Sequence, residues 1–115
     1  MTDKQRSLLP GTVDLVILKT LSEGAQHGFA VSRDIRARSN GVLELQDAAL
    51  YQALHRMENK GWISAEWGQS ENNRRAKFYR LTRTGRRRLD AEARSWREYA
   101  AAVFHVLEPS VVEES

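Results

Sequence analysis

Side chains able to form directional hydrogen bonds are concentrated in residues 47–60 of this 115-residue sequence. Leu50, Leu54 and Met57 recur at i, i+4 and i+7, which predicts a helix with one narrow buried face. The opposite face carries polar groups, and a tyrosine flanks them: Tyr51, Gln52, His55, Arg56 and Asn59. An amide or a guanidinium can pair with two atoms of one DNA base, so this set favours the reading of base edges in a DNA groove. Any amphipathic helix has a polar face, so the set needs support from elsewhere.

A second set of side chains is cationic. The whole chain has a net charge of only +3, but the charge is unevenly distributed. Glu71 to Asp90 contains eight basic and two acidic residues, whereas Leu89 to Ser115 contains two basic and six acidic residues. This uneven distribution indicates an anion-binding surface in the middle of the chain, while a solvated basic surface would explain the charge alone equally well. We expect four side chains of this region to contact DNA phosphates or a minor groove: Asn73, Arg74, Arg75 and Lys77.

Three short helices followed by a hairpin are predicted to position both sets. The helices are expected in three segments: Val13–Leu21, Gly28–Ser39 and Asp47–Lys60. Thr12 and Asp47 are the expected N-caps. Strands are expected over residues 42–46, 62–67 and 76–81, and the polar loop 68–73 joins the last two. This order predicts a mainly helical α+β fold, a winged helix-turn-helix, in which the third helix enters the major groove and the hairpin flanks it.

One long helix is predicted to follow, from Thr82 or Thr84 to about Glu108. Its apolar residues are spaced alternately by four and three, which gives a heptad seam suited to packing on another helix: Leu89, Ala93, Trp96, Ala100, Val103 and Leu107. We therefore expect residues 1–82 to form the DNA-binding domain. Residues 83–115 would form a helix that pairs two chains in a homodimer, followed by a short tail.

Enzyme, metal and membrane functions have no support in the sequence. It contains no phosphate loop, no nucleophile elbow and no paired carboxylates in a recognisable context, so we expect no catalytic residue and no cofactor. Cysteine is absent and the three histidines lack ligand spacing, which argues against a metal site. No apolar run approaches the roughly 20 residues that span a bilayer, and Met1–Pro10 has no signal-peptide pattern. A cytoplasmic location is the expectation.

Several ungapped segments resemble the PadR family of bacterial transcription regulators, and the resemblance covers nearly all of residues 8–107. It rests on Leu8–Leu18, His27–Phe29, Leu50–Glu58, Gly61–Ile63 and Ser70–Thr82. The resemblance implies a homodimeric winged-helix repressor that binds a palindromic operator, with the C-terminal helix forming much of the dimer interface. The single long C-terminal helix is similar to that of the shorter subfamily. Gln52 departs from the proline that family members commonly carry there, which bears on where the third helix begins.

Two alternatives remain open. Some members of the family release DNA when they bind an aromatic ligand, and Trp96, Tyr99 and Phe104 could line such a site, although a role as interface core is the favoured reading. The fold could also serve as a protein–protein interaction module, for which the heptad seam is equally suited. Polar and basic groups along both DNA-facing elements favour DNA. RNA is disfavoured because the major groove of an A-form helix is too narrow for a protein helix.

Overall fold

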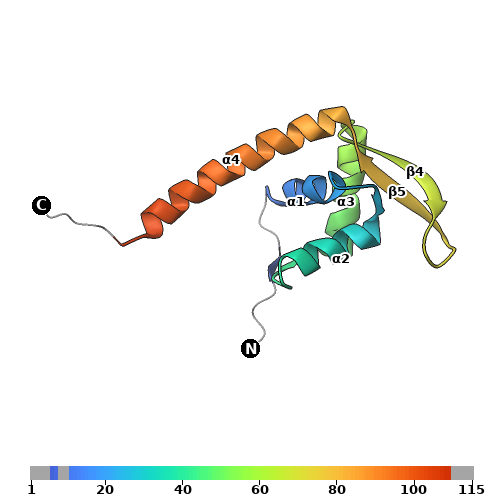
Figure 1. Cartoon of the computed structure of the whole chain (residues 1–115), viewed down its shortest axis with the longest axis horizontal. Helices are drawn as coiled ribbons and strands as arrows, with labels where there is room; N and C mark the ends of the chain where they lie inside the picture. Colours follow the sequence, from blue (N-terminus) through green and yellow to red (C-terminus); the bar gives the residue numbers. More distant parts are fainter. Residues whose placement is uncertain (1–5, 8–10, 110–115) are drawn as a thin grey trace, which may run out of the picture.

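The computed structural model describes residues 6–7 and 11–109 (Figure 1). It has the expected helices and strands in the expected order, together with two short strands, at residues 6–7 and 26–27, that the sequence pattern did not predict. Residues 8–10, which begin the family-like segments, and the expected tail at 110–115 lie outside the described residues. The elements are β1 (Arg6–Ser7), α1 (Val13–Leu21), β2 (Gln26–His27), α2 (Gly28–Arg38), β3 (Leu43–Glu44), α3 (Asp47–Asn59), β4 (Ile63–Gln69), β5 (Arg75–Leu81) and α4 (Arg83–Leu107). The predicted α+β winged helix-turn-helix is confirmed.

Thr12 occupies the N-cap of α1 as expected, whereas the N-cap expected at Asp47 lies one residue earlier. The side chain of Thr12 accepts no capping hydrogen bond, and Gln46 occupies the N-cap of α3 while Asp47 lies in its first turn. A carboxylate in the first turn interacts favourably with the helix dipole, so Asp47 stabilises α3 without serving as its N-cap. Because α3 begins well before Gln52, its start does not depend on a proline at that position.

The hairpin is longer than the sequence pattern predicts. Gly68 and Gln69, expected in the loop, belong to β4, where they pair with Ala76 and Arg75. The antiparallel ladder continues through them, so the loop shrinks to residues 70–74. β5 lies between β4 and the short β2 in a three-stranded antiparallel sheet, and β1 pairs in parallel with β3.

The core lies between the three short helices, the sheet and the start of α4. Its largest fully buried side chains come from every one of the short helices and from β4: Ile17, Leu18, Val31, Leu50, Leu54, Met57 and Ile63. Tyr79 of β5 is also buried, and burial raises the pKa of its phenol. This core fixes α3 against α1 and the hairpin, so the positions of the polar face and the cations follow from it.

The start of α4 is fastened to the turn between α3 and β4. The Thr82 hydroxyl caps α4 by accepting from the Gly85 backbone N–H at 3.0 Å, and the Thr82 N–H donates to the Trp62 carbonyl at 3.0 Å. A Cβ on Gly85 would lie 1.9 Å from that carbonyl oxygen, so only glycine allows this approach. Arg88 and Lys60 place their cationic groups 4.8 and 4.9 Å from the centroid of the Trp62 ring.

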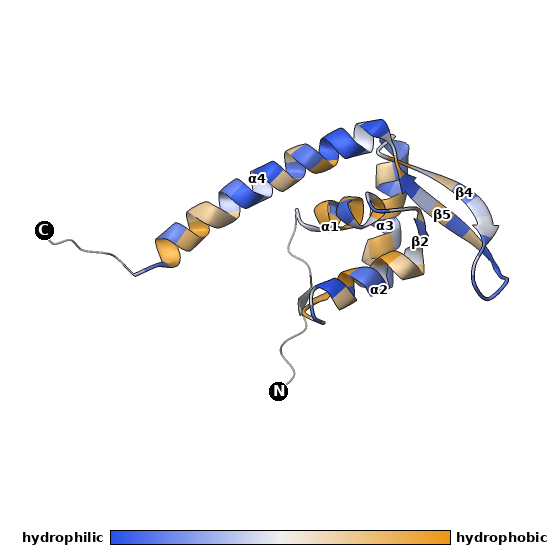
Figure 2. Ribbon diagram, in the orientation of Figure 1, coloured by the Kyte–Doolittle hydropathy of each residue, from blue (hydrophilic) through white to orange (hydrophobic). Residues whose placement is uncertain are grey.

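The C-terminal part of α4 extends away from the three short helices (Figure 1). Figure 2 shows that its far end is apolar, like the buried helices, although no other element of the described chain covers it. None of the helices in residues 6–7 and 11–109 is both long and apolar enough to cross a bilayer.

Candidate nucleic-acid interface

The exposed face of α3 holds an uncharged row of hydrogen-bonding side chains. Leu50, Ala53, Leu54 and Met57 turn into the core, and the side opposite carries Gln52, His55 and Asn59, all exposed. Asn59 Nδ2 lies 3.3 Å from His55 Nε2. The row therefore offers amide and imidazole donors and acceptors along the solvent side of α3, as expected for contacts with base edges.

Arg56 lies at the edge of α3 that faces α1, away from the middle of this row. Its guanidinium Nη2 donates a hydrogen bond to Asp14 Oδ1 of α1. The side chains of Arg56 and Asp14 are 45% and 23% exposed, so the ion pair is only partly open to water. A hollow of about 280 Å³ beside the pair is also lined by Gln52. The guanidinium thus uses one amino group on Asp14 and keeps its other donors for a ligand in this hollow.

Tyr51 lies at the opposite edge of α3, and its ring packs against α2. A Cβ added to Gly28, the first residue of α2, would lie 2.8 Å from both Cε1 and the hydroxyl oxygen of Tyr51. Any larger residue at position 28 would therefore displace the Tyr51 ring from its place against α2. The arrangement leaves the half-exposed Tyr51 with its hydroxyl at the N-terminal end of α2.

The tip of the hairpin presents two arginines. Ser70 N–H donates to the Arg74 carbonyl at 2.8 Å and Asn73 N–H to the Ser70 carbonyl at 2.9 Å, which closes the loop with Asn73 in the left-handed region at φ 63°. Asparagine tolerates this conformation better than most residues, which gives Asn73 a structural role in the turn. The Arg75 guanidinium stacks over Trp67 with Cζ 4.8 Å from the ring centroid, and both arginine side chains are exposed.

Lys77, the third expected cation, is partly neutralised. Its Nζ lies 3.3 Å from Glu58 Oε1 of α3 and 5.7 Å from the centroid of the Tyr79 ring. The pair joins β5 to α3 across the contact between hairpin and helix. On the other face of the hairpin, Arg80 Nη2 lies 3.8 Å from Glu66 Oε2.

The structure therefore brings the expected side chains onto two neighbouring elements, but it adds two residues that the sequence did not single out. No sequence pattern indicates a role for Asp14, because its partner Arg56 lies 42 positions away and the contact depends on how α1 and α3 pack. The sequence gives a weak indication for Trp67, since it alternates with Ile63 and Ala65 along β4 and is followed by a basic strand that pairs with it.

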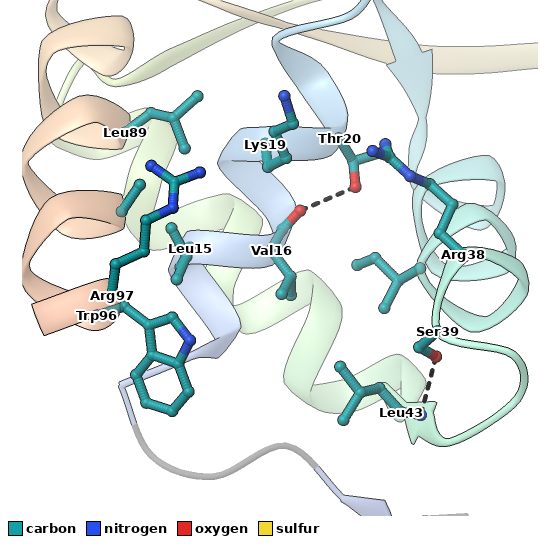
Figure 3. Close-up of a pocket in the computed structure, with 12 residues that line it drawn as sticks. Leu15, Val16, Lys19, Thr20, Arg38, Ser39, Leu43, Leu89, Trp96 and Arg97 are labelled. Atoms are coloured by element: carbon teal, nitrogen blue, oxygen red, sulfur yellow. Dashed lines mark hydrogen bonds between the residues drawn. The ribbon is translucent and has the colours of Figure 1, made fainter. Parts of the chain in front are cut away.

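The expected dimer seam on α4 divides into a buried part and an exposed part. Leu89 is 7% exposed and belongs to the core of its own chain. Ala93 and Trp96 line a mostly apolar hollow of about 350 Å³ between α1, α2 and α4 (Figure 3). Farther along, Ala100 is half-buried, whereas Val103 and Leu107 are exposed. Tyr99 and Phe104 lie outside the lining of the hollow, with Tyr99 6.0 Å from Trp96 between ring centroids.

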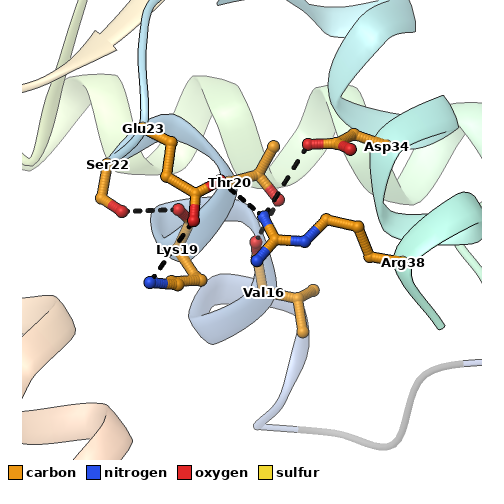
Figure 4. Close-up of polar contacts among 7 residues, drawn as sticks. All are labelled: Val16, Lys19, Thr20, Ser22, Glu23, Asp34 and Arg38. Atoms are coloured by element: carbon orange, nitrogen blue, oxygen red, sulfur yellow. Dashed lines mark hydrogen bonds and ion pairs between the residues drawn. The ribbon is translucent and has the colours of Figure 1, made fainter.

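Two cations that line this hollow, Lys19 and Arg38, form ion pairs with acidic side chains (Figure 4). Arg38 Nη1 donates to Glu23 Oε1 at 2.7 Å, and Lys19 Nζ lies 3.5 Å from the other Glu23 oxygen. The hydrogen bond from Arg38 lowers the pKa of the Glu23 carboxyl. Asp34 Oδ2 adds a weaker contact with Arg38 at 3.9 Å. Arg97 on α4 also lines the hollow, so its lining combines apolar side chains with three cationic ones.

Among residues 11–109, no group of three histidine or acidic side chains is arranged to hold a metal ion. The polar groups on α3 and the hairpin are suited to hydrogen bonding and charge neutralisation.

Comparison with known proteins places these features in a family. The profile of the transcriptional regulator PadR-like family matches residues 17–91. An uncharacterized protein from Lysinibacillus sphaericus is 30% identical over 91 residues, which cover 79% of this chain and 84% of that protein.

Two solved structures are similar over most of both chains. One is a transcriptional regulator from Clostridium thermocellum, with a TM-score of 0.77 and 26% identity over 85% of this chain and 95% of that one. The other is a PadR family transcription regulator from Clostridium difficile, with a TM-score of 0.73 and 28% identity over 84% of this chain and 99% of that one.

Proposed function

The chain belongs to the PadR-like family of transcriptional regulators, and from this premise we propose that it is a homodimeric repressor of a palindromic DNA operator. One observation carries the proposal: the uncharged row on α3 lies beside a hairpin with unneutralised arginines, and the Lys77–Glu58 pair links the two elements. An interaction module for proteins has no need of base-reading amides on one element and phosphate-binding cations on its neighbour.

In this proposal α3 enters the major groove. Gln52 reads a base, His55 and Asn59 add hydrogen bonds, and Arg56 reads a guanine from its place beside Asp14. Tyr51 places its hydroxyl on a phosphate at the edge of the groove. The hairpin holds the DNA backbone through four residues: Asn73, Arg74, Arg75 and Lys77.

The dimer is supported by the exposed apolar face of α4. Trp96, Val103 and Leu107 remain open to solvent on one helix face, and a face of this kind requires cover. Residues 83–115 serve as the dimerisation helix and tail, and residues 1–82 as the DNA-binding domain, with Leu89 joining the two through the core. A twofold axis between paired α4 helices sets two copies of α3 about one DNA turn, or roughly 34 Å, apart.

A small aromatic effector is the second part of the proposal. Trp96 is 39% exposed and forms one wall of the hollow in Figure 3, whose volume suits part of an aromatic molecule. Tyr99 and Phe104 lie outside that wall and fit the role of interface core better. An occupant of the hollow would contact both α1 and α4, and so would shift the DNA-binding domain relative to the dimer helix.

The test of DNA binding is fluorescence anisotropy with two duplexes at several salt concentrations, one from upstream of the chain's own gene and one scrambled. Preference for the native duplex together with a steep salt dependence supports the regulator. Equal weak binding to both duplexes and to duplexes selected from random sequences would contradict sequence specificity. Absence of binding at low salt would favour the protein–protein module.

The effector is tested with a panel of aromatic compounds, measuring both Trp96 fluorescence and operator affinity. The proposal expects at least one compound to change the two together. If neither quantity responds to any compound, Trp96 belongs to the interface core alone.

A further inference from the structure

Trp67 is the large exposed aromatic residue of the hairpin. Its side chain is 57% exposed, and the Arg75 guanidinium covers part of the ring with Cζ 4.8 Å from the centroid. A single exposed tryptophan is common on protein surfaces and by itself needs no explanation. The guanidinium over the ring is the informative feature, because it restrains a long flexible side chain that would otherwise sample many rotamers.

The stack lies on the side of the hairpin that faces α3. Side chains alternate between the two faces along a strand, so Trp67 shares a face with the buried Ile63. Lys77 is the cross-strand partner of Trp67 and reaches Glu58 of α3 from that face. Arg75, two residues before Lys77, occupies the same face nearer the tip. Trp67 and Arg75 therefore extend the α3-facing strip of the hairpin beyond the end of the core.

Arg75 differs from the other cations of its strand. Lys77 is paired with Glu58 and Arg80 with Glu66, whereas the described part of the chain gives Arg75 the indole ring and no carboxylate. A ring contacts the flat face of a guanidinium and leaves the N–H groups at its edge available. An acidic partner would occupy those same donors. The tryptophan thus orders Arg75 without neutralising it.

We propose that Trp67 is a positioning residue of the DNA interface, which holds the Arg75 guanidinium edge-on to a backbone phosphate. This inference rests on the proposed function and adds to it the residue that orders the wing arginine. A phosphate oxygen accepts paired N–H bonds from the edge of a guanidinium, so a stacked arginine meets it without losing further freedom. The contact is independent of sequence because every nucleotide presents the same phosphate.

The test is a double-mutant cycle with Trp67→Ala, Arg75→Ala and the double variant, measured on a selected and a scrambled duplex at several salt concentrations. Trp67→Ala is expected to weaken binding to both duplexes by about 3- to 10-fold. Once Arg75 is alanine, the tryptophan has nothing to position, so the double variant should match Arg75→Ala within about twofold. Arg75→Ala should also lower the salt slope by about 0.9, the share of one phosphate.

Arg80→Ala is the matched control, since Arg80 lies on the same strand, on the opposite face and beside Glu66. It should change affinity less than Arg75→Ala does. Arg75→Lys keeps the charge and the folded hairpin, so it tests the stack independently of any effect of Trp67→Ala on folding. It is expected to weaken both duplexes by about two- to fivefold with an unchanged salt slope.

Additive losses in the cycle, or wild-type affinity of both Trp67→Ala and Arg75→Lys, would overturn the role of Trp67. A loss confined to the selected duplex would overturn the phosphate contact. Failure of the wild-type protein to bind either duplex would instead contradict the proposed function itself, so the two failures are distinguishable.

Discussion

In both α3 and the hairpin, an acidic side chain of a neighbouring element pairs with one cation. The two regions differ in the other polar side chains that they expose. On α3, Asp14 holds Arg56, and the exposed row that is left is uncharged. On the hairpin, Glu58 holds Lys77, and two unpaired arginines remain at the tip. Neutral amides and imidazoles form hydrogen bonds that depend on the base they meet, whereas a guanidinium attracts any phosphate. We therefore propose that the intramolecular ion pairs divide base discrimination and general affinity between the two regions.

Gln52→Ala is expected to produce the largest effect on discrimination. It removes an amide that can pair with adenine at two atoms, which is worth about 1–3 kcal/mol against the wrong base. Affinity for the operator should fall about 5- to 150-fold, while affinity for scrambled DNA and the salt slope should remain as in the wild type. Anisotropy titrations on both duplexes measure this. Equal losses on the two duplexes would remove Gln52 from base reading.

Arg74→Ala/Arg75→Ala should have the opposite signature. Both duplexes should be bound about tenfold more weakly, and the salt slope should fall by about 1.8, because two phosphate contacts are lost. The matched control is Arg83→Ala/Arg87→Ala on α4, which removes two exposed cations outside the tip of the hairpin. A loss of preference for the operator in the hairpin variant would contradict the division between the two regions.

Asp14→Asn tests the restraint on the α3 side. The substitution removes a negative charge beside the groove and frees the Arg56 guanidinium, so scrambled DNA should be bound severalfold more tightly. The operator should gain less, because the freed guanidinium is no longer held where it reads a guanine. The ratio of the two affinities is the measured quantity. A lower melting temperature with an unchanged ratio of operator to scrambled-DNA affinity would show that the Asp14–Arg56 pair only stabilises the packing of α1 against α3.

Glu58→Gln applies the same test to the hairpin and should have the smallest effect. Lys77 loses its carboxylate partner and can pair with a phosphate instead, so the salt slope should rise by up to about 0.9 and both duplexes should gain affinity by a similar factor of about two or three. Salt titrations of the variant and the wild type provide the comparison. A change in operator preference would show that Lys77 also takes part in discrimination.

Much of this arrangement could be predicted from the sequence, because it rests on local periodicity. The i, i+4, i+7 pattern of Leu50, Leu54 and Met57 places Gln52 on the exposed face, and the structure agrees. The hairpin also follows from alternation, although the ladder runs two residues farther into the loop through Gly68.

Contacts between distant elements could not be predicted in this way. The Asp14–Arg56 pair depends on the packing of α1 against α3, and no local pattern encodes that distance. The heptad seam has a related ambiguity, since the same spacing places Leu89 in the core of its own chain and Val103 in solvent. Periodicity identifies an apolar face, but whether the same chain or a second one covers it depends on the tertiary structure.

The central claim is that side chains of α3, Arg56 included, discriminate between sequences through hydrogen bonds to bases, while cations on the hairpin supply general affinity through their charge. The most direct test measures wild-type affinity for operator and scrambled duplexes across a range of salt concentrations. The account predicts that both affinities fall steeply and in parallel, so that their ratio stays constant. A ratio that collapses as salt rises would contradict it, because discrimination would then depend on charge.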